Sequence, residues 1–117
     1  MKTKNIIQQW FTFWETGNFL ELPISDDFTH KSPFGIIDGK ANYLKLVESN
    51  KEKFLGYQFK IIDALYEKDK ACVRYKGKQQ DFELDVSEWY YLENNLIKSI
   101  VAYYHIGEIR EDRQLDY

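Results

Sequence analysis

The chain has 117 residues, a length that fits one domain with a hydrophobic core of its own. Hydrophobic residues make up 44% and charged residues 30%, which excludes an intrinsically disordered chain. The net charge of -3 and the scattered basic residues exclude a typical nucleic-acid binder, whose surface is basic. We therefore expect one domain over residues 1–117 and no nucleic-acid partner.

The single cysteine, Cys72, excludes an internal disulfide and a zinc site built from cysteines. It lies in a strand-like run, where packing is its expected role. No apolar stretch is long enough to cross a membrane, and the first residues lack a signal-peptide pattern. We expect a cytoplasmic protein with no membrane partner. Because the two histidines have no carboxylates at metal-ligand spacing, we expect no metal and no cofactor.

Apolar residues at helical spacing predict an amphipathic helix from Thr3 to about Thr16. Thr3 can cap its start, and Gly17 supplies the left-handed residue that commonly ends a helix. The residues of the apolar stripe are Ile6, Ile7, Trp10, Phe11 and Trp14.

A short turn or single helical turn is predicted around Pro23, followed by a strand over about 27–33. A second long helix is predicted to begin at Asp38-Gly39, with Asp38 as the cap, and to end at Gly56.

From residue 57 the hydrophobic period changes from 3.6 to 2, which predicts strands at about 57–67, 70–77, 81–93 and 96–106. The breaks between them are short and polar, as hairpins require. Helices followed by such a meander indicate the α+β class. We expect a curved antiparallel sheet wrapped around the N-terminal helices, which forms a cone with an apolar pocket.

One alternating phase of strand 81–93 is apolar except for Glu88, so the side chain of Glu88 is predicted to point inward. A buried carboxylate must be paired, hydrogen-bonded or kept protonated. Glu88 is therefore a candidate functional acid. Two structural alternatives are an ion pair with an arginine and a bulge that turns the side chain outward.

His30 and Ser32 interrupt the apolar face that Phe28 and Phe34 form on the opening strand. Histidine titrates near neutral pH, which makes His30 a candidate for proton transfer. The alternative is a core or rim histidine whose hydrogen bonds are satisfied.

On the last strand Lys98 marks the outward phase, so Tyr103 and His105 are predicted to point inward. The inward aromatic residues either pack in the core or form the wall of a pocket. These residues are Trp10, Trp14, Phe28, Phe34, Tyr90 and Tyr103.

The order of elements, with "FTHKSPFGIIDGKANYLKLVESN" and the late "GKQQDFELDVSEWYYLENNLIKSIVAYYHIGE", resembles the nuclear transport factor 2-like (cystatin-like cone) superfamily. Within it the SnoaL-like polyketide cyclase and ketosteroid isomerase branch is most similar. The resemblance extends to about residue 108 and implies the cone fold, which hosts enzymes, binders and transport adaptors.

The resemblance also locates two positions of the isomerase site. The isomerases carry a general-base aspartate just ahead of a proline, where this chain has Ser32 before Pro33. Their protonated aspartate, an oxyanion donor, is matched by Glu88. His30 resembles the histidine that SnoaL-like members often place before the aspartate-proline pair.

These observations support an acid–base isomerase or cyclase that lacks the usual general base and acts on a small hydrophobic carbonyl compound. Its catalytic residues would be His30 and Glu88. The alternative is a non-catalytic module that binds an apolar ligand in the same pocket. An epoxide hydrolase would need an inward arginine, whereas Arg74 is predicted outward. The predicted ligand-binding residues are Trp10, Trp14, Phe28, Ser32, Phe34, Tyr90, Tyr103 and His105.

The outward phases of the late strands carry Trp89, Tyr91 and Tyr104. This is more aromatic surface than a monomer usually exposes, so we expect a homodimer formed through the convex face of the sheet.

Overall fold

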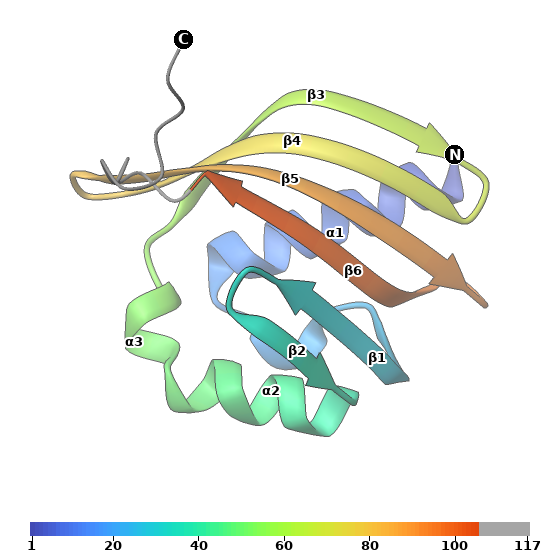
Figure 1. Ribbon diagram of the computed structural model, residues 1–117, viewed down its shortest axis with the longest axis horizontal. Helices are drawn as coiled ribbons and strands as arrows, with labels where there is room; N and C mark the ends of the chain where they lie inside the picture. The colour runs from blue at the N-terminus through green and yellow to red at the C-terminus, as the bar shows by residue number, and fades with distance from the viewer. Residues whose placement is uncertain (106–117) are drawn as a thin grey trace, which may run out of the picture.

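The computed structural model describes residues 1–105, which form helices packed on one curved, six-stranded sheet (Figure 1). The helical segments are α1 (Lys2–Thr16), the 3-10 turn η1 (Phe19–Glu21), α2 (Lys40–Ser49) and α3 (Lys51–Phe54). The strands are β1 (Ile24–Ser32), β2 (Gly35–Asp38), β3 (Gln58–Glu67), β4 (Lys70–Gln79), β5 (Phe82–Glu93) and β6 (Leu96–His105).

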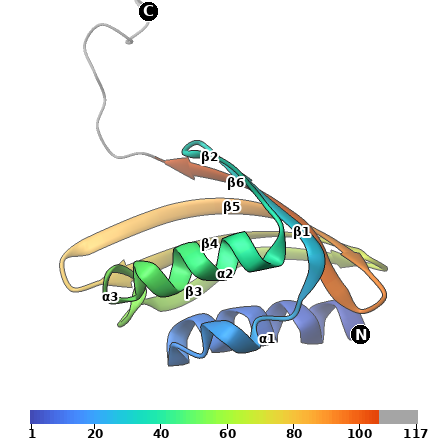
Figure 2. The same ribbon diagram turned by 90° about the horizontal axis from the view of Figure 1, so that it is seen from below.

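The strand order in the sheet is β2-β1-β6-β5-β4-β3. All neighbouring strands are antiparallel except β1 and β6, which run parallel to each other. The sheet curves around α1 and α2, as Figure 2 shows. The predicted α+β class and cone are confirmed, and the sheet is mixed rather than wholly antiparallel. Among the helices of residues 1–105, none has the length and hydropathy that a membrane-spanning helix needs.

Helix α1 follows the predicted apolar stripe and ends as predicted at Gly17, whose φ of 80° is left-handed. The predicted cap at Thr3 is wrong, because the helix already begins at Lys2. Thr3 is buried within the first turn, and its hydroxyl accepts a hydrogen bond of 3.2 Å from the backbone N–H of Asp69. The threonine therefore joins α1 to the turn between β3 and β4.

The chain between the two long helices forms a hairpin, β1–β2, where the sequence predicted a single strand. Asp38 is the last residue of β2 and does not cap α2. Gly39 precedes α2 with a φ of 90° and donates its N–H to the carbonyl oxygen of Phe28 at 2.7 Å. The predicted second helix is broken at Asn50 into α2 and the short α3. Gly56, with a φ of 88°, follows α3.

The predicted meander is confirmed, since β3 to β6 begin and end within two residues of the predicted bounds. The Asn94-Asn95 turn has positive φ at both residues, which matches the twist of a tight hairpin.

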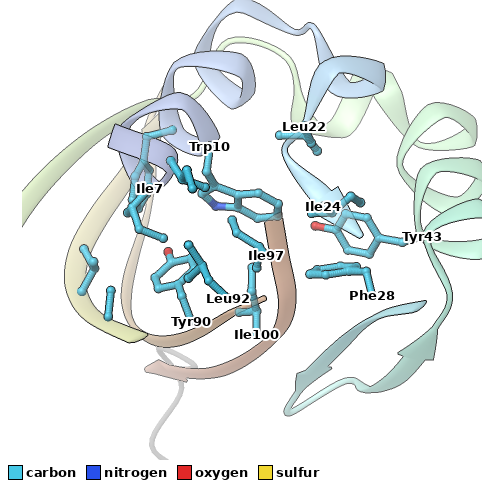
Figure 3. Packing of buried hydrophobic residues seen from close by; sticks show 14 of the residues in the cluster. Ile7, Trp10, Leu22, Ile24, Phe28, Tyr43, Tyr90, Leu92, Ile97 and Ile100 are labelled. Atoms are coloured by element: carbon cyan, nitrogen blue, oxygen red, sulfur yellow. The ribbon is translucent and has the colours of Figure 1, made fainter. Parts of the chain in front are cut away.

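The core lies between α1, α2 and the concave face of the sheet (Figure 3). Trp10 of α1 is at its centre, with ring centroids 6.3 Å from Tyr43 of α2 and 6.4 Å from Tyr90 of β5. Below Trp10, Ile97 and Ile100 of β6 are fully buried. Burial of each such side chain contributes roughly 1.5–3 kcal/mol, so this cluster fixes the helices against the sheet.

Candidate functional site

A cavity of about 500 Å³ lies between the helices and the concave face of the sheet. Its volume is within the range of small-molecule sites. The wall is mainly apolar and aromatic, with polar groups from β1, β5 and β6. Six of the predicted site residues line it, namely Trp10, Trp14, His30, Ser32, Phe34 and Glu88. Their functional roles remain predictions.

Two other predicted ligand-binding residues belong to the core and do not line the cavity. Phe28 is fully buried behind His30 and Tyr43, with ring centroids at 6.4 and 4.9 Å respectively. Tyr90 is fully buried under Trp10 and Phe11. Both side chains pack behind the residues that form the cavity wall. We therefore assign Phe28 and Tyr90 to the core and not to ligand binding.

Tyr103 is also wrongly assigned, because a bulge in β6 reverses the alternation after Lys98. Tyr91 pairs with Ser99 and Leu92 pairs with Ile97, so Lys98 is the extra residue. Tyr103 therefore points to the outer face and is 61% exposed.

Tyr104 lines the cavity instead, contrary to its predicted outward position. The side chain of His105 lies outside the described residues.

The carboxyl group of Glu88 is buried at the cavity wall, with 2% of the residue exposed. The register of β4 and β5 is continuous at Glu88, so no bulge turns the side chain outward. The Tyr90 hydroxyl donates to Glu88 Oε1 at 3.0 Å. Burial raises the pKa of Glu88 to about 7, although hydrogen bonds from Tyr75 and Tyr90 act in the opposite direction.

No arginine or lysine within residues 1–105 pairs with Glu88, so the predicted structural alternative of an arginine ion pair is not observed. Arg74 pairs with Asp63 at 3.2 Å, and both side chains are exposed. Arg74 does not line the cavity, so it does not form the set of two aspartates and an arginine that an epoxide hydrolase needs there.

His30 faces Glu88 from β1, with Nε2 at 3.9 Å from Glu88 Oε2. The imidazole packs against the Tyr43 ring at 5.4 Å, and only 8% of the residue is exposed. Burial lowers the pKa of His30 to about 4. The distance exceeds that of a hydrogen bond, and burial favours the uncharged form of each group. Between about pH 4 and 7 His30 and Glu88 are therefore a neutral pair, with the proton on the carboxyl group.

Ser32, Phe34 and Tyr104 lie together at one side of the cavity. The Phe34 N–H donates to Ser32 Oγ at 3.2 Å, which stabilises the turn between β1 and β2. Phe34 is 80% exposed and its ring lies 5.8 Å from that of Tyr104. Burial, with a contribution from Glu88, raises the pKa of Tyr104 to about 12, so its phenol remains a neutral hydrogen-bonding group.

Sequence reasoning did not assign Tyr43, Tyr75 or Tyr104 to the site, although all three line the cavity. The signal for Tyr75 was present, because it follows Ala71 and Val73 on the inward phase of its strand. Tyr43 could also have been found, since it lies one helical turn before the buried Val47.

No protein-family model matches the sequence, and no curated protein matches it. Solved structures do match the fold. A nuclear transport factor 2-like protein of unknown function from Cytophaga hutchinsonii has a TM-score of 0.76 at 21% identity, over 88% of this chain and 89% of that chain. A candidate ketosteroid isomerase from Kribbella flavida has a TM-score of 0.77 at 15% identity, over 99% of this chain and 90% of that chain.

A candidate isomerase of the SnoaL-like family from Agrobacterium tumefaciens has a TM-score of 0.71 at 13% identity, over 89% of this chain and 97% of that chain. The class that the fold and the cavity define is an α+β cone with a mainly apolar cavity inside it. The chain has the nuclear transport factor 2-like fold, as its resemblance to this superfamily predicted. At these identities the likeness shows the fold alone.

Proposed function

We propose that this chain binds a small, largely apolar carbonyl compound and moves a proton on it, as an isomerase or cyclase does. The observation that supports the proposal is the buried carboxyl group of Glu88 at the wall of an apolar cavity. Its pKa of about 7 is close to the value that general acid–base catalysis requires at neutral pH. The apolar wall would select the ligand, and the few polar groups would orient it.

In the proposed step the carboxyl proton of Glu88 passes to the carbonyl oxygen while His30 Nε2 takes a proton from the adjacent carbon. The products are an enol, a glutamate anion and an imidazolium, so atoms and charge balance. The separation of 3.9 Å puts both groups within reach of one carbonyl and its neighbouring carbon. The new glutamate anion favours the imidazolium, which offsets the low basicity that burial gives to His30. Tyr90 would act as a positioning residue through its hydrogen bond to Glu88.

A non-catalytic binding module is the second candidate, and the position of Ser32 favours it. Ser32 stands where the isomerases have their general base, and its hydroxyl accepts a hydrogen bond from the Phe34 amide. A serine in a turn cannot replace an aspartate as a base at neutral pH. In this case the cavity would hold an apolar ligand without changing it.

Deuterium exchange into 2-tetralone separates the two candidates. The ketone is incubated in D₂O with the protein, and loss of its α-proton signals is followed by NMR. Catalysis predicts exchange above the buffer rate, reduced about 10²- to 10⁴-fold in Glu88→Gln. Glu93→Gln is the matched control, because Glu93 is on the same strand and exposed. Binding of the ketone without exchange would instead establish the binding module.

We also propose that the chain pairs with a second copy through the outer face of the sheet. Leu65, Cys72, Trp89 and Val101 are cross-strand partners in one row across β3, β4, β5 and β6. Within residues 1–105 no helix is packed on the face where Leu65 and Trp89 are exposed. A second sheet packed on this row would bury its apolar side chains.

A further inference from the structure

The charge of the cavity wall restricts the ligands that it can accept. Within residues 1–105, none of the residues that line the cavity is a lysine or an arginine. Glu83 and Glu88 are the acidic lining residues in the described part of the chain, and Glu88 is the buried one. A carboxylate or phosphate ligand would therefore enter without a positive partner and beside an acid.

The groups around Glu88 do not supply a positive charge either. His30 is neutral at neutral pH, because burial lowers its pKa to about 4. The other ionisable groups next to the carboxyl group are phenols, whose pKa values burial and the neighbouring Glu88 raise above their usual range. They come from α2, β4, β5 and β6 and are Tyr43, Tyr75, Tyr90 and Tyr104. An ionised Glu88 thus has no permanent counter-ion among residues 1–105.

The aromatic wall provides a second element of cation recognition. Trp10, Trp14, Tyr43 and Tyr75 are among the aromatic residues that line the same cavity as Glu88. Aromatic ring faces attract cations, and the attraction is strongest where water is excluded. A buried carboxylate and aromatic rings together match a hydrophobic ammonium ion, because the carboxylate binds the charge and the rings bind its apolar body.

We propose that the cavity binds hydrophobic primary or secondary amines in their protonated form, with the Glu88 carboxylate as the counter-ion. The inference rests on the same cavity as the proposed function but assigns it a second class of ligand. Glu88 Oε1 accepts from Tyr90, and Tyr75 also hydrogen-bonds the carboxyl group. Because an ionised carboxylate has about four acceptor positions, it can still accept a hydrogen bond from the ammonium N–H.

Binding of an amine and binding of a ketone require opposite states of Glu88. A ketone accepts a hydrogen bond from the protonated carboxyl group, whereas an ammonium ion pairs with the carboxylate. Below about pH 7 the amine must therefore displace the carboxyl proton into the buffer. The affinity for the amine is expected to rise with pH up to about 7, and the affinity for the ketone to fall above it.

A matched pair of probes, 2-aminotetralin and 2-tetralone, tests the inference because the two molecules share one carbon skeleton. Calorimetric titrations at pH 6 in two buffers of different ionisation enthalpy count the protons released. We expect the amine to release about one proton and the ketone none. Glu88→Gln should weaken the amine roughly ten- to hundredfold and leave the Kd of the ketone within about threefold. Glu93→Gln should leave both unchanged.

The outcomes distinguish this inference from the proposed function. Ketone binding without amine binding, or amine binding that releases no proton and survives Glu88→Gln, overturns the amine site and leaves the carbonyl proposal standing. Amine binding with proton release, but no ketone binding, supports the amine site and removes the carbonyl ligand. If neither probe binds to the wild-type protein, both proposals are wrong. The proton count uses the wild-type protein, so it does not depend on the folding of a variant.

Discussion

Glu88→Gln should change the stability of the protein in a way that depends on pH. Burial raises the pKa of Glu88 from 4.5 to about 7, so the native state holds this proton more tightly than the unfolded chain does. The neutral carboxyl group of Glu88 therefore contributes to the free energy of unfolding. This contribution is fully present below pH 4.5 and is lost as pH rises through about 7. A glutamine has a similar shape and does not ionise, so the variant does not undergo this loss.

The difference between the unfolded-state and native-state pKa values of Glu88 sets the size of this change in stability. Each pKa unit corresponds to about 1.4 kcal/mol, so the full shift corresponds to about 3 kcal/mol. We expect Glu88→Gln and wild type to have similar free energies of unfolding near pH 4.5. The variant should be more stable by about 3 kcal/mol at pH 8, or roughly 10 °C in Tm for a domain of this size.

His30 contributes a second pH dependence of opposite sign. Burial lowers its pKa from 6.5 to about 4, so the native state binds this proton less tightly than the unfolded chain does. The contribution of the neutral imidazole to the free energy of unfolding is fully present above pH 6.5 and is lost as pH falls through about 4. Between pH 4.5 and 6.5 the two slopes oppose each other, and wild-type stability should change little. In Glu88→Gln only the histidine slope remains, so its stability should rise with pH over this range.

Urea unfolding of wild type and Glu88→Gln at several pH values between 4.5 and 8 measures both slopes. Glu93→Gln is the control, with an expected change within about 0.5 kcal/mol. A Glu88→Gln variant less stable than wild type at pH 8 would refute the reasoning. That result would mean that Glu88 is ionised in the native protein and held by a charged partner.

Three further predictions concern the cavity, α1 and the outer face of the sheet. Phe34→Ala and Tyr104→Ala should each weaken binding of the neutral dye Nile red several-fold, whereas Tyr103→Ala should not; equal loss in all three would mean that the two faces of β6 are reversed. Gly17→Ala should lower the free energy of unfolding by about 1–3 kcal/mol in urea titrations, because φ is +80° and a Cβ would lie 2.7 Å from a leucine side chain. Sedimentation at tens of micromolar should give a dimer, and Trp89→Lys a monomer; a wild-type monomer would contradict the proposed pairing.

The strands could be predicted from the sequence because period-2 alternation and polar turns are local signals. The position of Glu88 followed from the same alternation, which remains valid where the register of β4 and β5 is continuous. The alternation failed in β6, where Lys98 is the extra residue of a bulge. Before the bulge Lys98 indicates the outward phase correctly, and after it every side chain is reversed. A lysine is exposed in either case, so its identity does not reveal the extra residue.

The β1–β2 hairpin was missed for a different reason. Pro33 was interpreted as the end of a strand, and Asp38 as a helix cap, since both residue types are common at such boundaries. The sequence Ser32-Pro33-Phe34-Gly35 is equally typical of a tight turn, and Gly35 has a φ of 127°. A pairing of only four residues is too short for its alternation to compete with these local signals.

The distance between His30 and Glu88 depends on the order of the strands, which alternation does not specify. His30 is on β1 and Glu88 on β5, and β6 lies between these strands. His30 pairs with Ile100 of β6, and Glu88 pairs with Ala102 two residues farther along. The single methyl group of Ala102 leaves space above β6 that a larger inward side chain would fill, so the two polar groups can approach across it. The parallel pairing of β1 and β6 therefore brings together two separate interruptions of the apolar pattern and makes them one site.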